Sequence, residues 1–432
     1  MIVSASSDHP GCATTSGSTE AAIVWENAVR QFLFVALVCL LGLTADPTRA
    51  ADAFTLHDGD SVVLLGNTLV EREQQTGYWE SALTRRYPDR NVQFRNLGWS
   101  GDTVFGEARA GFGTAADGFK HLKEHVLALK PTVILVAYGS NEAFDGKKGL
   151  PRFVQGLNAL LETLAPTQAR IVLLSPLRQE DLGRPLPDPA EQNKRLALYR
   201  DAIRATAQKR GLPFVDLHEL VGEVATAAPL TDNGIHLTPY GYWRTTAVLE
   251  KGLGLPGQRW RVELSAKGGK LTAQGARLSD VRMSSLRFRA TDDVLPAPPP
   301  PTAGAPKKPA GQGERVLRVT DLSPGSYTLT IDGKPVATAD AAGWAKGVRL
   351  EHGPEFEQSE RLRQAVVAKD RLYFYRWRPQ NETYLFGFRK HEQGKNAREV
   401  PQFDPLVARK EAEITKLRVP VAHTYELKIS HR

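Results

Sequence analysis

Short apolar runs alternate with amphipathic segments from residue 59 to about residue 255. Five of the apolar runs are predicted to be strands, at residues 61–65, 91–95, 132–137, 170–174 and 213–215. Strands that alternate with helices in this way are typical of an α/β sheet with parallel strands.

Between these strands, apolar residues recur at helical spacing and predict the helices. They are Phe119, Leu122, Val126 and Leu129 before the third strand, Phe153, Leu157, Leu160, Leu161 and Leu164 after it, and Leu196, Tyr199, Ile203 and Ala207 before the fifth. Five parallel strands with short crossovers predict a three-layer, flavodoxin-like sandwich. Ligands of such sheets bind beyond the carboxyl ends of the strands.

After residue 257 the pattern changes to residue-by-residue alternation, which predicts a small β-rich unit over residues 258–354. Its strands are expected at residues 260–264, 285–289, 316–320 and 326–331, and a turn follows at Asp332 and Gly333. Residues 295–313 interrupt it with a proline-rich insertion, which we expect to be extended or disordered. Residues 355–432 are predicted to be a helical segment that packs on the α/β domain of residues 51–257.

The length and the composition agree with several cores. A chain of 432 residues with 41% hydrophobic and 24% charged residues can bury two or three cores. The net charge is +8, but basic residues are spread along the chain and mostly interleaved with acids. This distribution favours a solvated surface over nucleic-acid binding, and leaves an anionic polysaccharide open as a partner.

Residues 1–50 are predicted to be a signal peptide with an upstream extension. The apolar run at residues 31–43 has the length of a secretory h-region, and Thr48, Arg49 and Ala50 resemble a cleavage site. The run is too short to span a bilayer comfortably, so no membrane span is expected in the mature chain. Cys12 and Cys39 both precede the cleavage site, which suits a thiol-free protein of the periplasm or the exterior.

Two hydroxyl residues compete for the place of a catalytic nucleophile. Ser61, in the sequence Gly59-Asp60-Ser61, precedes the first strand and is read as part of a turn that enters it. Thr68, in the sequence Gly66-Asn67-Thr68, follows the strand. Only Thr68 is therefore expected at the carboxyl end of the sheet, where a substrate would bind.

Four blocks of sequence now resemble the SGNH hydrolases, also called the GDSL esterase/lipase family. They are Gly66-Asn67-Thr68, the stretch from Asn96 to Asp102 that contains Gly101, the stretch Gly139-Ser140-Asn141-Glu142, and the stretch from Thr231 to His236. Each block follows the expected strand or lies near the end of the domain, in the order that this family shows. The resemblance covers about residues 57–255.

The resemblance implies a set of catalytic residues. Thr68 stands where the family has its nucleophilic serine, and His236 stands where it has its base. Gly101, Asn141 and the backbone N–H of Thr68 would form the oxyanion hole. These are the groups that acyl transfer requires, namely a hydroxyl, an imidazole and donors aimed at the developing oxyanion.

Two positions depart from the pattern of the family. Thr68 carries a methyl group that restricts its χ1 angle and crowds the path of attack. The acid of the family would fall at Asn233, whereas the carboxylate of Asp232 lies one residue earlier. Asp232 is placed as the residue that orients His236, and Glu142 is a weaker substitute. If only Asn233 contacts the imidazole, His236 loses both its tautomer control and its stabilising charge.

Four residues are placed in substrate binding. Trp99 and Glu142 lie within the second and third of the four blocks that resemble the family. Tyr384 and Arg389 belong to a polar, aromatic stretch at residues 376–394. Aromatic rings can stack on sugars and arginine can bind carboxylates in a fork. We expect this stretch to fold over the carboxyl-end face, although a buried helix would have a similar composition.

No cofactor is predicted. His121 and His125 are four residues apart, but Glu124 is the only acid nearby, so a metal site is not expected. Phosphate-loop and dinucleotide fingerprints are absent from the sequence.

The resemblance, together with the predicted signal peptide, thus implies an exported SGNH-type hydrolase of ester bonds on a small molecule or a polysaccharide, with acetyl esters as one substrate class. A non-catalytic carbohydrate-binding protein on the same scaffold is the alternative. A structural protein of the cell envelope is a third, weaker reading.

Overall fold

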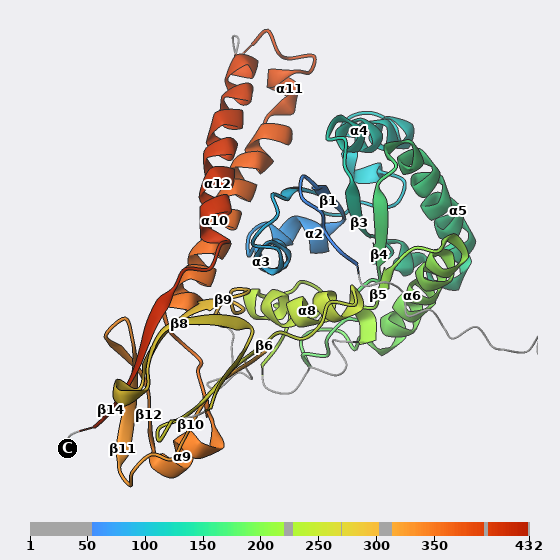
Figure 1. Cartoon of the computed structure of the whole chain (residues 1–432). Helices are drawn as coiled ribbons and strands as arrows, with labels where there is room; N and C mark the ends of the chain where they lie inside the picture. The colour runs from blue at the N-terminus through green and yellow to red at the C-terminus, as the bar shows by residue number, and fades with distance from the viewer. Residues whose placement is uncertain (1–53, 220–227, 269, 302–312, 393–395, 431–432) are drawn as a thin grey trace, which may run out of the picture. The chain divides into compact units, whose positions relative to one another are not determined.

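The structure is a computed structural model that describes residues 54–219, 228–268, 270–301, 313–392 and 396–430 (Figure 1). The predicted signal peptide, both cysteines and most of the proline-rich insertion lie outside these residues. No helix in the described part of the chain is long and apolar enough to cross a membrane.

The α/β domain contains a parallel sheet of five strands, as predicted. The strands are β1 (Ser61–Gly66), β2 (Gln93–Gly98), β3 (Val133–Ala137), β4 (Arg170–Leu174) and β5 (Phe214–Val215), and their order is β2-β1-β3-β4-β5. This is the strand order of a flavodoxin-like sheet, in which the order reverses beside β1. The second strand begins two residues later than predicted and ends three residues later.

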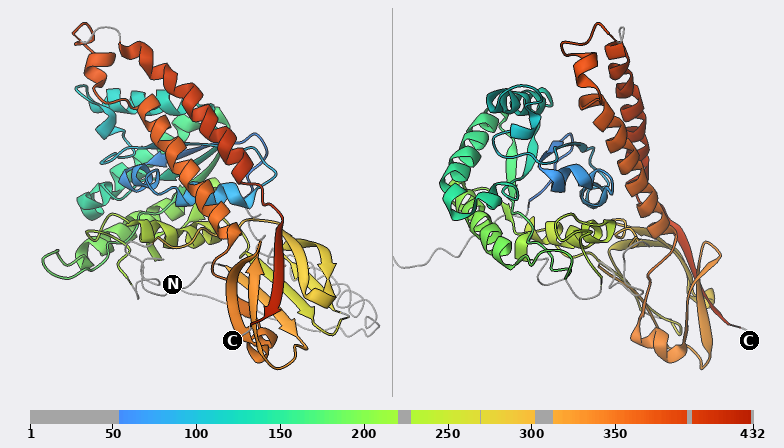
Figure 2. Two further views of the ribbon diagram at one scale, coloured as in Figure 1. Left: turned by 90° about the vertical axis from the view of Figure 1, so that its left-hand side faces the viewer. Right: turned by 180° about the vertical axis from the view of Figure 1, so that it is seen from behind.

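Helices cover both faces of this sheet (Figure 2). Alternate residues of each strand point to opposite faces, so Val63 packs with one helical layer and Val62 with the other. One layer consists of α4 (Ala115–Ala128), α5 (Gly146–Leu164) and α6 (Ala190–Arg210), and the other of α3 (Tyr78–Arg86) and α8 (Pro239–Gly252). The predicted three-layer sandwich is therefore confirmed.

Short helices connect the strands to these layers. They are α2 (Thr68–Glu73), η1 (Glu107–Arg109), η2 (Glu142–Asp145) and η3 (Ala165–Thr167). The helix α2 begins directly after β1, because Asn67 caps its first turn by accepting a hydrogen bond from the N–H of Leu69 at 3.1 Å. The loop after β1 is therefore short, and it leaves Thr68 at the edge of the sheet.

Two further sheets follow the α/β domain. The first has the order β13-β10-β6-β7 and consists of β6 (Arg259–Ser265), β7 (Leu271–Gln274), β10 (Glu314–Thr320) and β13 (Val348–Arg349). The second has the order β12-β11-β14-β9-β8 and consists of β8 (Ala276–Arg282), β9 (Arg287–Asp292), β11 (Ser326–Ile331), β12 (Lys334–Asp340) and β14 (His423–Ile429). The short helices η4 (Met283–Ser285) and α9 (Ala341–Lys346) lie between these strands. The two sheets share a core that contains Trp260, Leu329, Trp344 and Tyr425.

The last part of the chain is not entirely helical, in contrast to the prediction for residues 355–432. It forms α10 (Pro354–Trp377), α11 (Glu382–Leu385), η5 (Asn396–Gln402) and α12 (Phe403–Leu417), and then the strand β14. The helices α10 and α12 run side by side, as both views of Figure 2 show. β14 returns to the second β sheet and pairs with β11 and β9, so residues 423–429 belong to the β unit.

A buried ionic cluster joins α10 to the α/β domain. The Nζ atom of Lys369 lies 2.7 Å from carboxylate oxygens of Glu80 and of Asp370, and it donates to the carbonyl oxygen of Phe94 at 3.1 Å. All three charged side chains are almost fully buried. A buried lysine needs such partners, because an unpaired charge away from water is costly. This cluster therefore fixes α10 against α3 and β2.

Candidate active site

A small pocket of about 70 Å³ lies at the carboxyl ends of β1 and β3. Three of the predicted catalytic residues, Thr68, Asn141 and His236, line it together. The remaining lining residues come from α2 and its N-cap, from the loop after β3 with η2, from the loop after β4, from α6, and from α8 and the segment before it; they are Asn67, Leu69, Arg72, Ser140, Phe144, Leu177, Arg178, Gln179, Leu196, Ile235, Leu237 and Tyr242. The polar groups thus meet within a largely apolar wall.

The hydroxyl of Thr68 faces the predicted oxyanion loop. Its Oγ1 atom accepts a hydrogen bond from the backbone N–H of Gly101 at 3.2 Å. Gly101 has a φ of 77°, a left-handed conformation that glycine adopts without strain. Ser61 instead begins β1, at the opposite end of the strand, where its N–H donates to Thr132. The structure therefore brings Thr68, and not Ser61, to the pocket.

A buried network holds the loop that follows β2. The carboxylate of Asp102 accepts from Nε of Arg109 at 2.6 Å and from the hydroxyl of Tyr138 at 3.0 Å. The Nδ2 atom of Asn141 donates to the carbonyl oxygen of Asp102 at 2.7 Å. One of the two N–H groups of this amide is thus used, and the other is free for a ligand. Gly101 and Asn141 are held near one another, as an oxyanion hole requires.

His236 is contacted by Asn233 and not by a carboxylate. The Oδ1 atom of Asn233 accepts from the backbone N–H groups of Ile235 at 3.1 Å and of His236 at 2.9 Å. These two bonds orient the amide, so its Nδ2 atom donates to Nδ1 of His236 at 3.2 Å. Because Nδ1 then accepts, the proton of the neutral imidazole lies on Nε2. The catalytic histidine of a serine hydrolase has the opposite tautomer.

Asp232, which was predicted to orient His236, forms an ion pair with Arg72 instead. Its carboxylate pairs with Nη2 of Arg72 at 2.7 Å, one turn along α2 from Thr68. Partial burial of His236 lowers its pKa, and the charge of Arg72 lowers it further, against an opposing effect of Asp232. The imidazole is therefore neutral near pH 7. No hydrogen bond joins Thr68 to His236 in the described structure.

Glu142 lies beside the pocket but does not line it. Its two carboxylate oxygens accept from the backbone N–H groups of Val104 at 2.8 Å and of Gly139 at 2.9 Å. Burial raises the pKa of Glu142 to about 7. Both oxygens are occupied by the protein, so the structure gives Glu142 a bracing contact between two loops instead of the predicted contact with substrate.

The other three predicted substrate-binding residues do not line the pocket either. The ring of Trp99 is covered by protein, since the guanidinium of Arg378 lies 3.7 Å from its centroid and the ring of Trp377 lies 5.8 Å away. Arg389 lies over the ring of Tyr384 at 4.6 Å and pairs with a glutamate three residues later. Tyr384 and Arg389 therefore contact each other, away from Thr68.

Several residues that line the pocket were not predicted from the sequence. Arg72 follows Thr68 by four residues on α2, a spacing that places both on one side of a helix and could have revealed it. Phe144 and Ile235 are large apolar side chains that remain about half exposed, at 58% and 47%. Both lie close in sequence to predicted catalytic residues. Arg178 had no such signal.

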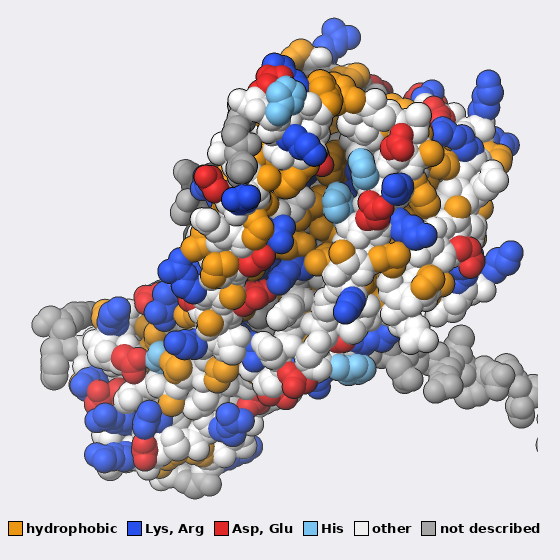
Figure 3. Space-filling view, turned by 90° about the horizontal axis from the view of Figure 1, so that it is seen from above, with side chains coloured by type: hydrophobic (Ala, Val, Ile, Leu, Met, Phe, Trp, Pro, Cys, Tyr) orange, Lys and Arg blue, Asp and Glu red, His pale blue; other side chains and the backbone are white. Residues whose placement is uncertain are grey.

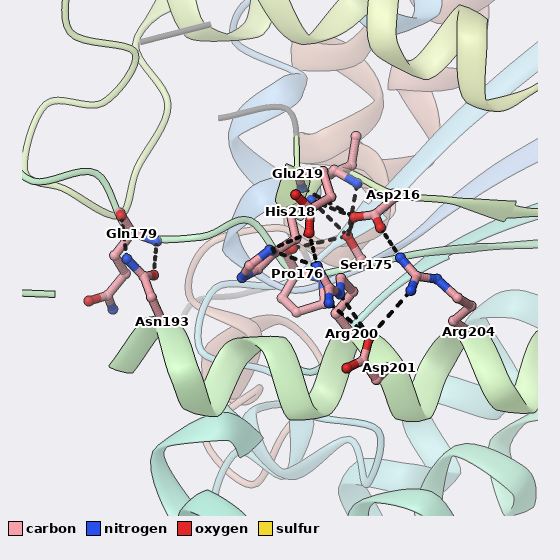
Figure 4. Close-up of polar contacts among 11 residues, drawn as sticks. Ser175, Pro176, Gln179, Asn193, Arg200, Asp201, Arg204, Asp216, His218 and Glu219 are labelled. Atoms are coloured by element: carbon pink, nitrogen blue, oxygen red, sulfur yellow. Dashed lines mark hydrogen bonds and ion pairs between the residues drawn. The ribbon is translucent and has the colours of Figure 1, made fainter. Parts of the chain in front are cut away.

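A second serine, histidine and aspartate lie at the carboxyl ends of β4 and β5 (Figure 4). The Oγ atom of Ser175 is fully buried and accepts from the backbone N–H groups of Leu217 at 2.8 Å and of His218 at 3.0 Å. The ring of His218 instead lies near Arg200, with Nδ1 3.4 Å from Nη1. Asp216 accepts from the N–H of His218 at 3.0 Å. Backbone donors occupy the serine oxygen, so this cluster is structural and does not form a catalytic triad.

A larger groove of about 590 Å³ lies between α4 and the helices α10, α11 and α12. Figure 3 shows hydrophobic side chains gathered in a hollow on the face seen from above. Tyr373, Trp377 and Phe386 contribute aromatic rings to the groove, and His125 lines it from α4. Burial lowers the pKa of His125 to about 4, so this residue is neutral. Within the described residues, no group of three or more His, Cys, Asp or Glu side chains is placed to hold a metal ion.

Residues 59–244 match the model of the GDSL-like lipase/acylhydrolase family. This domain belongs to that family, the SGNH hydrolases. The match spans the sheet, the Thr68 pocket and the N-terminal part of α8, and the fold agrees with the predicted family. No curated protein matches the chain.

Solved structures resemble the SGNH domain and, in one case, more of the chain. The structure of a gut microbial diltiazem-metabolizing enzyme is 18% identical, aligns over 88% of this chain and 100% of its own, and has a TM-score of 0.68. The structure of Axe2, an acetylxylan esterase from Geobacillus stearothermophilus, is 18% identical, aligns over 46% of this chain and 96% of its own, and has a TM-score of 0.37. The first alignment extends beyond the SGNH domain, so the fold of the C-terminal half also occurs in another protein.

Proposed function

We propose that the SGNH domain is a slow ester hydrolase that binds an acyl group in the Thr68 pocket. The observation that supports this most directly is the 3.2 Å contact between the N–H of Gly101 and the hydroxyl oxygen of Thr68. This contact supports the roles of Gly101 as an oxyanion donor and of Thr68 as the nucleophile, and His236 lines the same pocket as Thr68. Substrate carbonyl oxygen would be held by Gly101, by the free amide N–H of Asn141 and by the N–H of Thr68.

In the proposed reaction, proton transfer to His236 is the slow step. Attack by the Thr68 hydroxyl, or by a water molecule, requires a base with an unprotonated nitrogen that faces the pocket. In the dominant tautomer Nε2 of His236 carries the proton, because Asn233 donates to Nδ1. The reaction therefore proceeds through the minor tautomer, which breaks this hydrogen bond. In serine hydrolases an oxyanion hole without a complete triad still gives a rate about 10³–10⁴ above that in water.

The size of the pocket favours an ester with a small acyl group. The pocket volume of about 70 Å³ is small beside the roughly 300–1,000 Å³ of typical ligand pockets, so the pocket suits a small acyl group such as acetyl better than a long chain. Acetyl esters of a polysaccharide are the substrate class we propose, in the periplasm or outside the cell, where the predicted signal peptide would deliver the protein.

A second candidate is a carbohydrate-binding protein without turnover. It is favoured by the contact of Asn233 with His236, because an amide in this place supplies neither the tautomer nor the charge that a catalytic imidazole needs. In such a protein the Nε2–H group of His236 would serve as a hydrogen-bond donor to a ligand.

Hydrolysis of an activated acetyl ester distinguishes the two candidates. The wild type, Thr68→Ser, Thr68→Ala and His236→Ala are compared with His391→Ala, a control in which an exposed histidine is removed. A hydrolase predicts a rate above background that is lost in His236→Ala and kept in the control. A binding protein predicts only the background rate in the wild type. If His236→Ala leaves a measurable rate unchanged, the assignment of the site is refuted.

A further inference from the structure

Glu71 joins the helix that carries Thr68 to the loop that carries Gly101. It lies on α2, three residues after Thr68, and its Oε2 atom accepts from the backbone N–H of Ser100 at 2.6 Å. Ser100 directly precedes Gly101, whose own N–H reaches Thr68 at 3.2 Å. One carboxylate therefore sets the distance between the nucleophile and its oxyanion donor.

A guanidinium from a distant part of the chain contacts Glu71 and the residue that precedes Ser100. Nη1 of Arg378 lies 2.7 Å from Oε2 of Glu71, although the two residues are 307 positions apart in the sequence. The same guanidinium lies 3.7 Å from the ring centroid of Trp99, the residue before Ser100. Arginine combines a charged hydrogen bond with stacking on an aromatic face in a way that lysine cannot.

Arg378 is presented from a fixed position. It directly follows α10, and α10 is anchored in the α/β domain by the buried ion pair between Lys369 and Glu80 at 2.7 Å. The preceding residue, Trp377, packs its ring against Trp99 at a centroid distance of 5.8 Å. The side chains of Arg378 and Glu71 are only 26% and 17% exposed, so water screens their interaction less than at an open surface.

We propose that Arg378 is a positioning residue for the oxyanion hole, and that the SGNH domain is complete only when α10 is docked on it. Arg378 touches neither the pocket nor the reacting atoms. It acts through Glu71 and Trp99, which fix Ser100 and hence the direction of the Gly101 N–H. This inference rests on the proposed function for its kinetic consequence, but its structural consequence is independent of hydrolysis.

The kinetic test compares Arg378→Gln and Arg378→Lys with Arg376→Gln in the full-length protein. Arg376 lies in the last turn of α10, two residues before Arg378, and pairs with Asp404 at 2.8 Å, outside the oxyanion loop, so its variant is a matched control. A misplacement of about 1 Å in a catalytic group costs on the order of 100-fold. We therefore expect Arg378→Gln to lower kcat by about 10- to 100-fold with KM nearly unchanged. Arg378→Lys should recover part of the loss, because it retains the charge opposite Glu71 but not the stacking.

Amide hydrogen exchange tests the same inference without any substrate. Peptides that contain residues 98–103 should exchange at least about tenfold faster in Arg378→Gln than in the wild type, because the Ser100 N–H loses a fixed acceptor. The control Arg376→Gln should leave this exchange unchanged. Faster exchange in a protein that hydrolyses no ester would support the role of Arg378 and refute the proposed hydrolase. Unchanged exchange in folded Arg378→Gln and Arg378→Lys would overturn the role of Arg378.

Discussion

Replacement of Asn233 by Asp restores the acid of the SGNH pattern with a change of one atom. Oδ1 of the new side chain can keep its bonds from the N–H groups of Ile235 and His236. The second oxygen replaces the Nδ2 group that now donates to the imidazole at 3.2 Å. The imidazole must then carry its proton on Nδ1, which leaves Nε2 unprotonated toward the pocket. We expect this variant to hydrolyse esters faster than the wild type.

The size of the effect follows from the exposure of residue 233. The reverse change in the triad of a serine protease lowers kcat about 10⁴-fold, which corresponds to about 5 kcal/mol at 1.36 kcal/mol for each factor of ten. That aspartate is buried, whereas Asn233 is exposed. A charge 4 Å from an imidazolium contributes about 1 kcal/mol in water and about 4 kcal/mol near a protein surface. We therefore expect kcat/KM to rise about 100-fold, and the pKa of His236 to rise by about one to two pH units.

Two measurements check this prediction. Hydrolysis of an activated acetyl ester gives kcat/KM, and proton NMR of the ring of His236 gives its pKa. Asn381→Asp, at an exposed residue outside the pocket, adds the same charge and should change neither value. If the pKa of His236 rises while the rate stays at the wild-type level, the tautomer does not limit catalysis and the reasoning fails. If the pKa does not rise, residue 233 does not contact the ring.

Three further changes test the charges and the packing around the site. Because burial and then Arg72 lower the pKa of His236, the acid limb of kcat/KM should lie below pH 6.5, and Arg72→Gln should move that limb to higher pH. Burial, then the charge of Asp370, raises the pKa of Glu73 from 4.5 to about 7, so the folded protein retains this proton where the unfolded chain has lost it. The unfolding free energy should fall by about 3 kcal/mol between pH 4 and pH 8 from this group, and urea unfolding of Glu73→Gln should lack that part of the fall. A Cβ atom at Gly98 would lie 2.1 Å from a backbone nitrogen of α2, so Gly98→Ala should lower the free energy of unfolding by roughly 1–3 kcal/mol, measured as a lower melting temperature. Gly257→Ala is the control, because a Cβ atom there meets nothing within 4 Å and should leave the melting temperature unchanged.

The parallel sheet was predictable because its strands are buried on both faces. β3, for example, is apolar at all five positions and all five are buried, a pattern that needs no knowledge of its neighbours. β2 was displaced in the prediction because Arg95 and Asn96 interrupt its apolar run. Asn96 is nevertheless buried, since its side chain bonds to the backbone of Val70 and Gly98. Such a contact depends on the fold and leaves no periodic signal.

Strands that pair across long stretches of sequence were harder to find. β14 shows alternate burial of His423, Tyr425 and Leu427, but it follows a helix and pairs with strands about 100 or more residues earlier. The edge strands β7 and β8 were missed for a different reason, since most of their residues are exposed. The pattern of apolar residues reports burial, and these two strands bury little.

At the site, sequence order predicted which loops converge but not how their side chains pair. Thr68, Asn141 and His236 follow strand ends or precede a helix, so topology alone brings them to one edge. Asp232 and Asn233 are neighbours in the turn between Thr231 and His236, and the conformation of this turn decides which of the two side chains reaches the imidazole. The sequence does not specify that conformation. The covering of Trp99 by Arg378 depends on a helix almost 280 residues later, and no local pattern could indicate it.

The position of β14 has a consequence for biosynthesis. It is the central strand of a five-stranded sheet, and it follows its partners β11 and β9 by about 100 or more residues. During translation β11 and β9 are therefore made well before β14, and the edges that pair with it stay open until α10, α12 and β14 have been synthesised. We expect assembly of the β unit to wait for β14, and a nonsense codon before residue 423 to leave the second sheet divided into the pairs β12-β11 and β9-β8.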